Sequence, residues 1–154
     1  MKDAFGGILN LFLIAIFLII VFGIMAFIVS YTKAFKMKNV VISAIEQYEG
    51  YGCFDTGQSM TACRRKIEDG AKSINYSPTT LSCPNGYNKV DGLFCASTGE
   101  LSSNAGKDWY LSSKPTSYRI VTQVDLQFPI INKIMGLHFF QVAGDTRVID
   151  PVNG

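Results

Sequence analysis

A single uncharged apolar run near the start of the chain constrains the fold more than any other feature. Residues 8–30 read ILNLFLIAIFLIIVFGIMAFIVS and contain no Asp, Glu, Lys or Arg. Because a helix rises about 1.5 Å per residue, this run can cross a bilayer core of about 30 Å. In hydrocarbon, every backbone N–H and C=O must be satisfied within its own segment, and only a helix does this for a single run. We expect a membrane-spanning helix.

Two other interpretations fit this run less well. Helices of soluble proteins average roughly 11 to 12 residues, about half of this length. A cleaved signal peptide has an apolar region of about 7 to 15 residues, followed by a small-residue cleavage site. Here Tyr31, Thr32 and Lys33 follow the run and do not resemble such a site. We therefore interpret residues 1–30 as a short head and a retained anchor.

The positive charge of the chain is concentrated beside this anchor. Lys33, Lys36 and Lys38 follow the apolar run, whereas the chain from Asn39 onward has ten Lys/Arg and eleven Asp/Glu. These three lysines are placed to meet anionic lipid headgroups. A nucleic-acid-binding domain would carry a basic face, which this balance does not predict. We expect membrane lipid as a partner, and neither nucleic acid nor a small-molecule substrate.

Four cysteines indicate a domain that is stapled by disulfides. Nine, nineteen and eleven residues separate Cys53, Cys63, Cys83 and Cys95. These spacings include neither the close pairs of a structural zinc site nor a C-x-x-C redox pair, and the only histidine is His138. No metal or cofactor is expected. Of the three connectivities, we favour Cys53–Cys63 with Cys83–Cys95, because each bridge closes a short loop.

The charges and the cysteines predict opposite orientations in the membrane. Lys33, Lys36 and Lys38 outnumber Lys2 and the terminal amine, and the positive-inside rule then places the C-terminal domain in the cytoplasm. Disulfides, however, form in oxidising compartments such as the cell exterior. Because the charge margin is small, we give the cysteines more weight and expect an extracellular domain.

The apolar run is predicted to continue as an amphipathic helix over residues 31–50. There is neither Gly nor Pro from residue 31 to residue 48, and apolar side chains recur at helical spacing. They are Met37, Val41, Ile45 and Tyr48, opposite Lys36, Asn39, Ser43, Glu46 and Gln47. We expect one helix of about forty residues, which Gly50 and Gly52 end.

Residues 51–154 are enough for one small domain. A short helix is expected through Ala62, Ile67 and Ala71, with three cations on its solvated side. Its candidate N-caps are Asp55, Thr56 and Ser59, and its cations are Arg64, Arg65 and Lys66. Residues 87–96 predict a hairpin around a two-residue Asp91-Gly92 turn of type I′.

The last forty residues have the strongest strand pattern. Alternation predicts a strand over residues 118–128, with Gln123, Asp125 and Gln127 outside and Pro129 at its end. Its buried face is Tyr118, Ile120, Thr122, Val124, Leu126 and Phe128. A second strand is predicted from about His138 to Ile149, with Gly144 as a bulge or bend. We expect these strands to pair antiparallel and to pack on the amphipathic helix, which gives an α+β fold.

Three positions in the apolar run are candidates for contacts between helices. Asn10 carries the only strongly polar side chain of the run, and an unpaired amide in lipid is costly. Gly23 and Ala26 form a small-residue spot where another helix can approach closely, although a lone spanning helix also tolerates such residues. Gly6 and Gly7, just before the run, are either a flexible joint or a processing site.

A Gly6-Gly7 pair before an apolar helix, an amphipathic extension, and a C-terminal strand pair within residues 118–129 and 142–149 occur together in this chain. This layout resembles type IV pilin-like proteins and, within that group, the small TadE-like subunits of tight-adherence pilus systems. The resemblance implies a structural subunit of a cell-surface filament or secretion assembly. It also implies processing at Gly6 or Gly7 and association of the N-terminal helix with copies of itself or with sister subunits.

The chain departs from the pilin pattern at one position. Pilins usually carry a Glu five residues after the cleavage glycine, whereas Leu11 or Phe12 stands there in this chain. The resemblance therefore favours a minor pilin or pseudopilin over a main fibre subunit. A membrane-anchored extracellular binding module that does not polymerise is the alternative. An enzyme is not expected, because the sequence has no nucleophile elbow, metal-ligand spacing or phosphate loop.

Overall fold

In the computed structural model, the apolar run and its amphipathic continuation form one helix, α1 (Lys2–Gln47), as predicted. The structure describes residues 2–54, 61–98, 115–125 and 139–149, with side chains from residue 6 onward. Residues 2–7, expected as a separate head, are helical. After α1, Gly50 has a φ of 77° and its N–H donates to the Ile45 carbonyl at 2.9 Å. The first left-handed residue after the helix is Glu49, with a φ of 50°, so the helix ends one position before the predicted Gly50.

Four antiparallel strands form one sheet in the order β1-β2-β3-β4. They are β1 (Asn88–Val90), β2 (Phe94–Thr98), β3 (Tyr118–Asp125) and β4 (Phe139–Asp145). The antiparallel pairing of β3 with β4 confirms the predicted C-terminal strand pair. The β1–β2 hairpin joins the same sheet through β2 and β3, which the sequence pattern did not predict. Predicted strand residues 126–128 and 138 lie outside the described residues.

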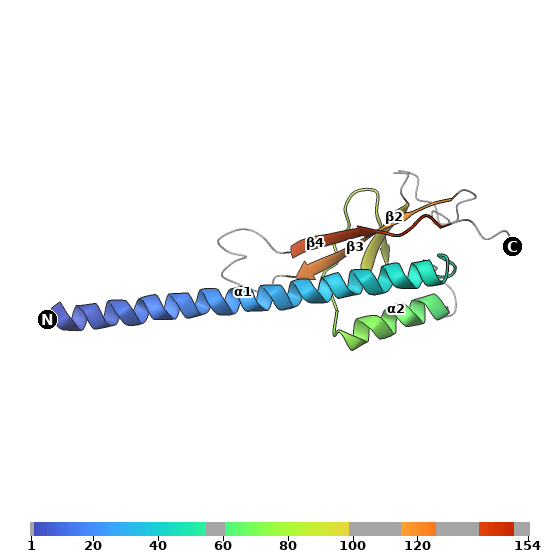
Figure 1. Cartoon of the computed structure of the whole chain (residues 1–154). Coiled ribbons are helices and arrows are strands. Elements are labelled where there is room, and N and C mark those ends of the chain that lie inside the picture. Colours follow the sequence, from blue (N-terminus) through green and yellow to red (C-terminus); the bar gives the residue numbers. More distant parts are fainter. Residues whose placement is uncertain (1, 55–60, 99–114, 126–138, 150–154) are drawn as a thin grey trace.

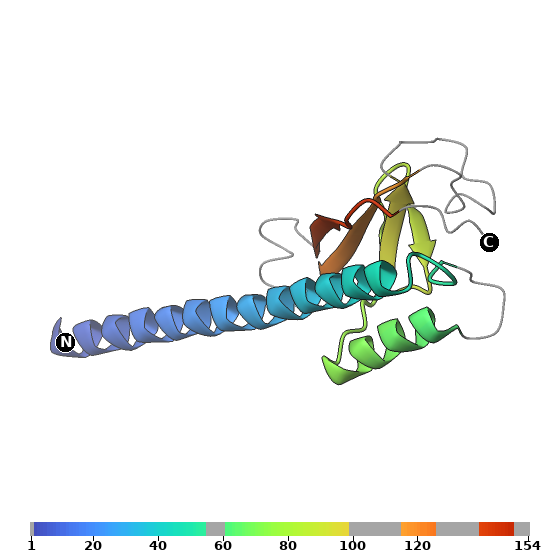
Figure 2. The same cartoon turned by 45° about the vertical axis from the view of Figure 1, so that its right-hand side comes forward.

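The second half of α1 lies between the sheet and a second helix, α2, as Figures 1 and 2 show from two directions. Met37, Val41 and Ile45, predicted as the buried stripe, are 0% exposed. The Thr122 hydroxyl of β3 donates to the Ala34 carbonyl of α1 at 2.9 Å. The same helix is therefore fully exposed at its start and is the core of the domain at its end. The architecture is α+β, as predicted.

The helix α2 (Ala62–Ser73) begins at Thr61, whose hydroxyl accepts a hydrogen bond from the Arg64 N–H at 3.4 Å. Thr61 is thus the N-cap, and the predicted caps at 55, 56 and 59 were wrong; those residues lie outside the described ranges. Along α2 one buried side chain per turn packs toward α1. These residues are Cys63, Ile67 and Ala71. Ala62, predicted among them, is exposed.

The turn between β1 and β2 is one residue longer than predicted. Val90 pairs with Phe94, so the connection contains Asp91, Gly92 and Leu93. Asp91 and Gly92 have φ values of 47° and 69°, and the Leu93 N–H donates to the Val90 carbonyl at 3.0 Å. The sequence therefore predicted the positive φ values of this turn correctly and its length incorrectly.

Gly144 is not the bulge or bend that the sequence predicted. It pairs with Ile120 in a continuous register between β3 and β4. A Cβ at this position would lie 2.8 Å from Lys38 Cδ and 3.0 Å from Ile42 Cδ1, both on α1. The side chains of Lys38 and Ile42 occupy the space that a side chain at position 144 would need.

Gln123 was predicted on the solvent face of β3, and this was wrong, because its side chain is only 2% exposed. Its Oε1 accepts from the Ser82 N–H at 2.9 Å, and its Nε2 donates to the Thr80 carbonyl at 2.5 Å. The segment around residues 79–83 therefore covers the face of the sheet that points away from α1. Asp125, also predicted outside, is half-buried and accepts from the Thr79 N–H at 2.6 Å.

Candidate functional site

The first half of α1 is an exposed apolar rod. Every side chain from residue 6 to residue 20 is exposed, and this part of the helix projects beyond the sheet and α2 (Figures 1 and 2). It is long and apolar enough to cross a membrane. An exposed apolar surface of this size requires a cover of lipid or of other apolar helices. The rod is the principal candidate for function in this molecule.

The three predicted helix-contact residues do not form one patch. Gly23 and Ala26 are one turn apart on the same side of α1, and the two-turn spacing of 23, 30 and 37 puts them on the side that faces the domain. No described atom lies within 4 Å of where a Cβ of Gly23 would stand. Asn10 lies about 20 Å further down the helix axis. A second helix that packs at Gly23 and Ala26 would therefore lie beneath the domain.

Gly6 and Gly7, the candidate processing residues, lie in the first turns of α1. A Cβ at either position would meet no described atom within 4 Å. Glycine in a helix costs about 1 kcal/mol relative to alanine, so it is unfavourable there without a compensating reason. Packing within the described chain supplies no such reason.

The three lysines after the run lie on α1 where the helix enters the domain. Lys33 Nζ donates to the Asn75 carbonyl at 3.5 Å, just after α2 ends. Lys38 Nζ lies 4.2 Å from the centroid of the Phe35 ring, a cation–π contact. Lys36 is exposed. All three ammonium groups lie along the two helical turns that follow the apolar rod.

Aromatic side chains gather at the same height, and the sequence analysis missed them. We call this set the aromatic collar: Phe27, Tyr31 and Phe35 of α1 with Phe139 and Phe140 of β4. The rings of Phe27 and Phe140 meet edge to face at 5.6 Å, and those of Tyr31 and Phe35 stack at 6.5 Å. The spacing of 27, 31 and 35 was a readable signal, whereas the approach of β4 was not.

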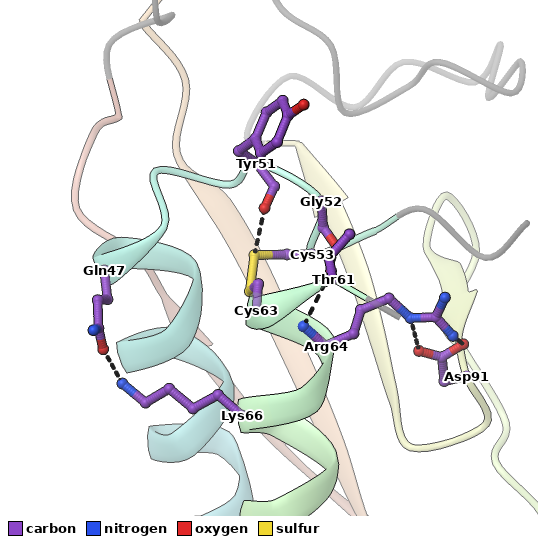
Figure 3. Close-up of a disulfide and its surroundings, with 9 residues drawn as sticks. All are labelled: Gln47, Tyr51, Gly52, Cys53, Thr61, Cys63, Arg64, Lys66 and Asp91. Atoms are coloured by element: carbon purple, nitrogen blue, oxygen red, sulfur yellow. Dashed lines mark hydrogen bonds and ion pairs between the residues drawn. A yellow bond between two sulfur atoms is a disulfide. The ribbon is translucent and has the colours of Figure 1, made fainter. Parts of the chain in front are cut away.

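Two disulfides fix the domain around the end of α1. Cys53 pairs with Cys63 and Cys83 with Cys95, with Cα atoms 5.1 and 5.6 Å apart, as favoured from the sequence. The first bridge ties the turn after α1 to the start of α2 (Figure 3). The second ties the segment before β1 to β2. All four cysteines of the chain are paired.

Arg64 corrects the expectation that residues 64–66 form a merely exposed cationic face. Its guanidinium makes two hydrogen bonds to the Asp91 carboxylate, at 2.9 and 2.7 Å, with both side chains largely covered (Figure 3). This bidentate pair joins α2 to the β1–β2 turn. Lys66 donates to the side-chain carbonyl of Gln47 and so joins α2 to α1.

A recess of about 370 Å³ lies beside α2 and the β1–β2 turn. Its two carboxylates are already paired, Asp91 with Arg64 at 2.7 Å and Glu68 with Lys72 at 3.8 Å. Within the described ranges, no three His, Cys, Asp or Glu side chains gather closely enough to hold a metal ion. The Asp91 carboxylate therefore joins the β1–β2 turn to α2, and the Glu68 carboxylate belongs to an ion pair within α2.

Comparisons with protein-family models, curated proteins and solved structures give no match for this chain.

Proposed function

We propose that this protein is a membrane-anchored structural subunit of a cell-surface filament or secretion assembly, of the minor pilin or pseudopilin kind. The observation that supports this most is the continuity of α1. Its first half is an exposed apolar rod, and its second half is the buried centre of the domain, where Met37 and Val41 are 0% exposed. The domain therefore cannot turn independently of the rod.

A rigid connection of this kind suits an assembly better than a tether. A tether needs only a flexible linker between anchor and domain, whereas a filament subunit must hold its domain at a fixed angle to a bundle of helices. In such a bundle the apolar rods bury one another, and Asn10 finds a protein partner for its amide. Gly23 and Ala26 offer the close approach, on the side of α1 beneath the domain.

Two further features support an extracellular, processed subunit. The pairing of all four cysteines suits an oxidising compartment and therefore a domain outside the cell. Glycine at positions 6 and 7 has no packing reason, and recognition by a processing peptidase is the reason that we propose. Enzymatic activity is not part of the proposal.

The alternative function is a single-pass binding module that never polymerises. It would use the same anchor, with lipid as the permanent cover of the rod. The recess beside α2 is then where a ligand would bind. The two functions differ in whether copies of α1 meet, which crosslinking measures directly.

The test is disulfide crosslinking of Gly23→Cys and of Ala26→Cys in cells that express the full assembly. The native cysteines can stay, because all of them are paired and the new thiol is then the only free one. Met25→Cys is the matched control, since it is 63% exposed at a similar depth and lies between the face of Gly23 and Ala26 and the face of Asn10. Crosslinked species at 23 and 26 that disappear without the assembly genes support the filament function. Exclusively monomeric protein would leave the anchored module.

A further inference from the structure

The aromatic collar brings the start of β4 close to the end of the uncharged run of α1, residues 8–30. Residues 8–26 of α1 span about 28 Å, close to the thickness of a bilayer core. Phe27 follows directly, and its ring contacts Phe140 at the start of β4. The start of β4 is therefore level with the boundary between hydrocarbon and headgroups, and not far above the membrane.

The collar is also partly exposed within the described chain. Phe139 and Phe140 are each 38% exposed, and Tyr31 and Phe35 are 44% and 41% exposed. Neighbouring residues of a strand point to opposite faces, so the two phenylalanines extend from both faces of the strand end. Aromatic side chains at such a boundary are the usual anchors of membrane proteins, because their rings suit the mixed environment of the headgroup region.

The lysines that lie among and just beyond the rings of the collar complement an anionic surface. Lys33 and Lys36 lie about 9 and 13 Å further along the axis than Phe27, within or just above the headgroup layer. Lysines near an anionic bilayer surface are attracted to it. No acidic residue occurs in α1 between Phe27 and Lys38. Along the axis the hydrocarbon-length segment is thus followed by a zone in which aromatic rings and cations alternate, as in the headgroup region of a bilayer leaflet.

We infer that the aromatic collar and these lysines form a membrane-docking surface, which seats the start of β4 in the headgroup region of a bilayer that contains anionic lipid. The domain is then held to the membrane at two places, by α1 and by Phe139–Phe140. Docking fixes the height and tilt of the domain before any assembly partner arrives. This inference rests on the membrane anchoring in the proposed function and is independent of polymerisation.

The test measures how close the start of β4 lies to lipid headgroups. Full-length protein with Gln141→Cys carries an environment-sensitive fluorophore and is reconstituted into vesicles of phosphatidylcholine and phosphatidylglycerol with nitroxide-labelled headgroups. Gln141 is exposed and adjoins Phe140, so both phenylalanines are retained. The same label at Tyr51→Cys is the control, because Tyr51 is 82% exposed and follows the far end of α1. We expect several-fold stronger quenching at 141 than at 51.

The collar itself is tested by Phe139→Ser with Phe140→Ser in the 141-labelled protein. Quenching at 141 should fall to the level at 51, while the protein still floats with the vesicles. Val148→Ser, which replaces an apolar residue that is 62% exposed beyond the other end of β4, should leave quenching unchanged. Near-ultraviolet circular dichroism of each variant verifies the fold. Lys33→Gln with Lys36→Gln should remove the increase in quenching that phosphatidylglycerol gives over phosphatidylcholine alone.

The outcomes separate docking from the proposed function. Equal quenching at 141 and 51 in protein that floats with the vesicles overturns docking and leaves the anchor intact. Quenching at 141 that survives both serine substitutions also overturns the role of the collar. Protein that does not float with the vesicles would overturn the anchor and docking together.

Discussion

The hydroxyl of Tyr76 binds the backbone of Gln123 at a point of β3 that the neighbouring strand β2 does not reach. It donates to the Gln123 carbonyl at 2.9 Å and accepts from the Gln123 N–H at 3.0 Å. The pairing of β2 with β3 extends only to Cys95 and Val121, so Gln123 lies beyond it. One phenol thus satisfies two buried backbone groups that would otherwise have needed a longer β2.

Tyr76→Phe should destabilise the domain by about 1 to 3 kcal/mol, because it leaves a buried donor and a buried acceptor without their partner. The measurement is urea unfolding of the full chain in detergent, followed by near-ultraviolet circular dichroism. Tyr51→Phe is the control; at an exposed position it should change the free energy of unfolding by no more than about 0.5 kcal/mol. Similar losses for the two variants would mean that the Tyr76 hydroxyl contributes nothing specific.

The same contact predicts a loss of stability at high pH. Burial raises the pKa of the Tyr76 hydroxyl from 10.0 to about 12, and burial also raises the pKa of Tyr118. The folded protein holds this proton more tightly than the unfolded chain. The contribution of the Tyr76 hydroxyl to the free energy of unfolding is therefore fully present below pH 10 and is lost as the pH rises from 10 to about 12. The urea midpoint should follow this decrease. Tyr76→Phe should make it shallower without abolishing it, because Tyr118 remains; an unchanged slope would contradict the prediction.

The helix and strands in which apolar residues recur at one regular spacing were predictable from the sequence. The stripe of Met37, Val41 and Ile45 and the alternation around Ile120 and Val124 gave the long helix, the strand pair and their contact. The position of Gln123 was not predictable in this way. Its polarity indicated solvent, and only the chain crossing at Thr80 and Ser82, held by a disulfide, provides a buried site with matching partners.

Close approaches between distant segments were likewise not readable. A glycine in a strand indicates a bulge as readily as a contact, and Gly144 is explained only by the side chains of Lys38 and Ile42. The aromatic collar combines residues more than one hundred positions apart, such as Phe27 and Phe140. Local periodicity has no information about which strand end meets which turn of the helix.

Gly70 predicts a second tight contact, between α2 and α1. A Cβ there would lie 2.4 Å from Cγ1 of Val40, a branched side chain with few alternative rotamers. Gly70→Ala should therefore destabilise the domain by about 1 to 3 kcal/mol, although alanine is the better helix former by about 1 kcal/mol. Adding Val40→Ala should recover most of this loss in the same unfolding assay. A stabilising Gly70→Ala would show that the two helices separate easily.

Gly144→Ala is the matched comparison for that variant. Its Cβ would meet mainly the outer atoms of Lys38, a flexible side chain that can move away, and the end of Ile42. The loss should therefore be smaller than for Gly70→Ala. Equal losses would mean that the rigidity of the neighbour does not decide the cost.

The two disulfides predict both the redox state and the side of the membrane of the mature protein. Thiol labelling of denatured, unreduced protein from cells should find no reactive cysteine, and proteolysis should release the peptides of Cys53 and Cys63 joined to each other, and likewise those of Cys83 and Cys95. Cys83→Ser with Cys95→Ser should cost about 2 to 4 kcal/mol, because that bridge restricts the unfolded chain and holds the segment that covers Gln123. Four reactive thiols in the cellular protein would instead place the domain in a reducing compartment, in agreement with the three lysines that follow the anchor.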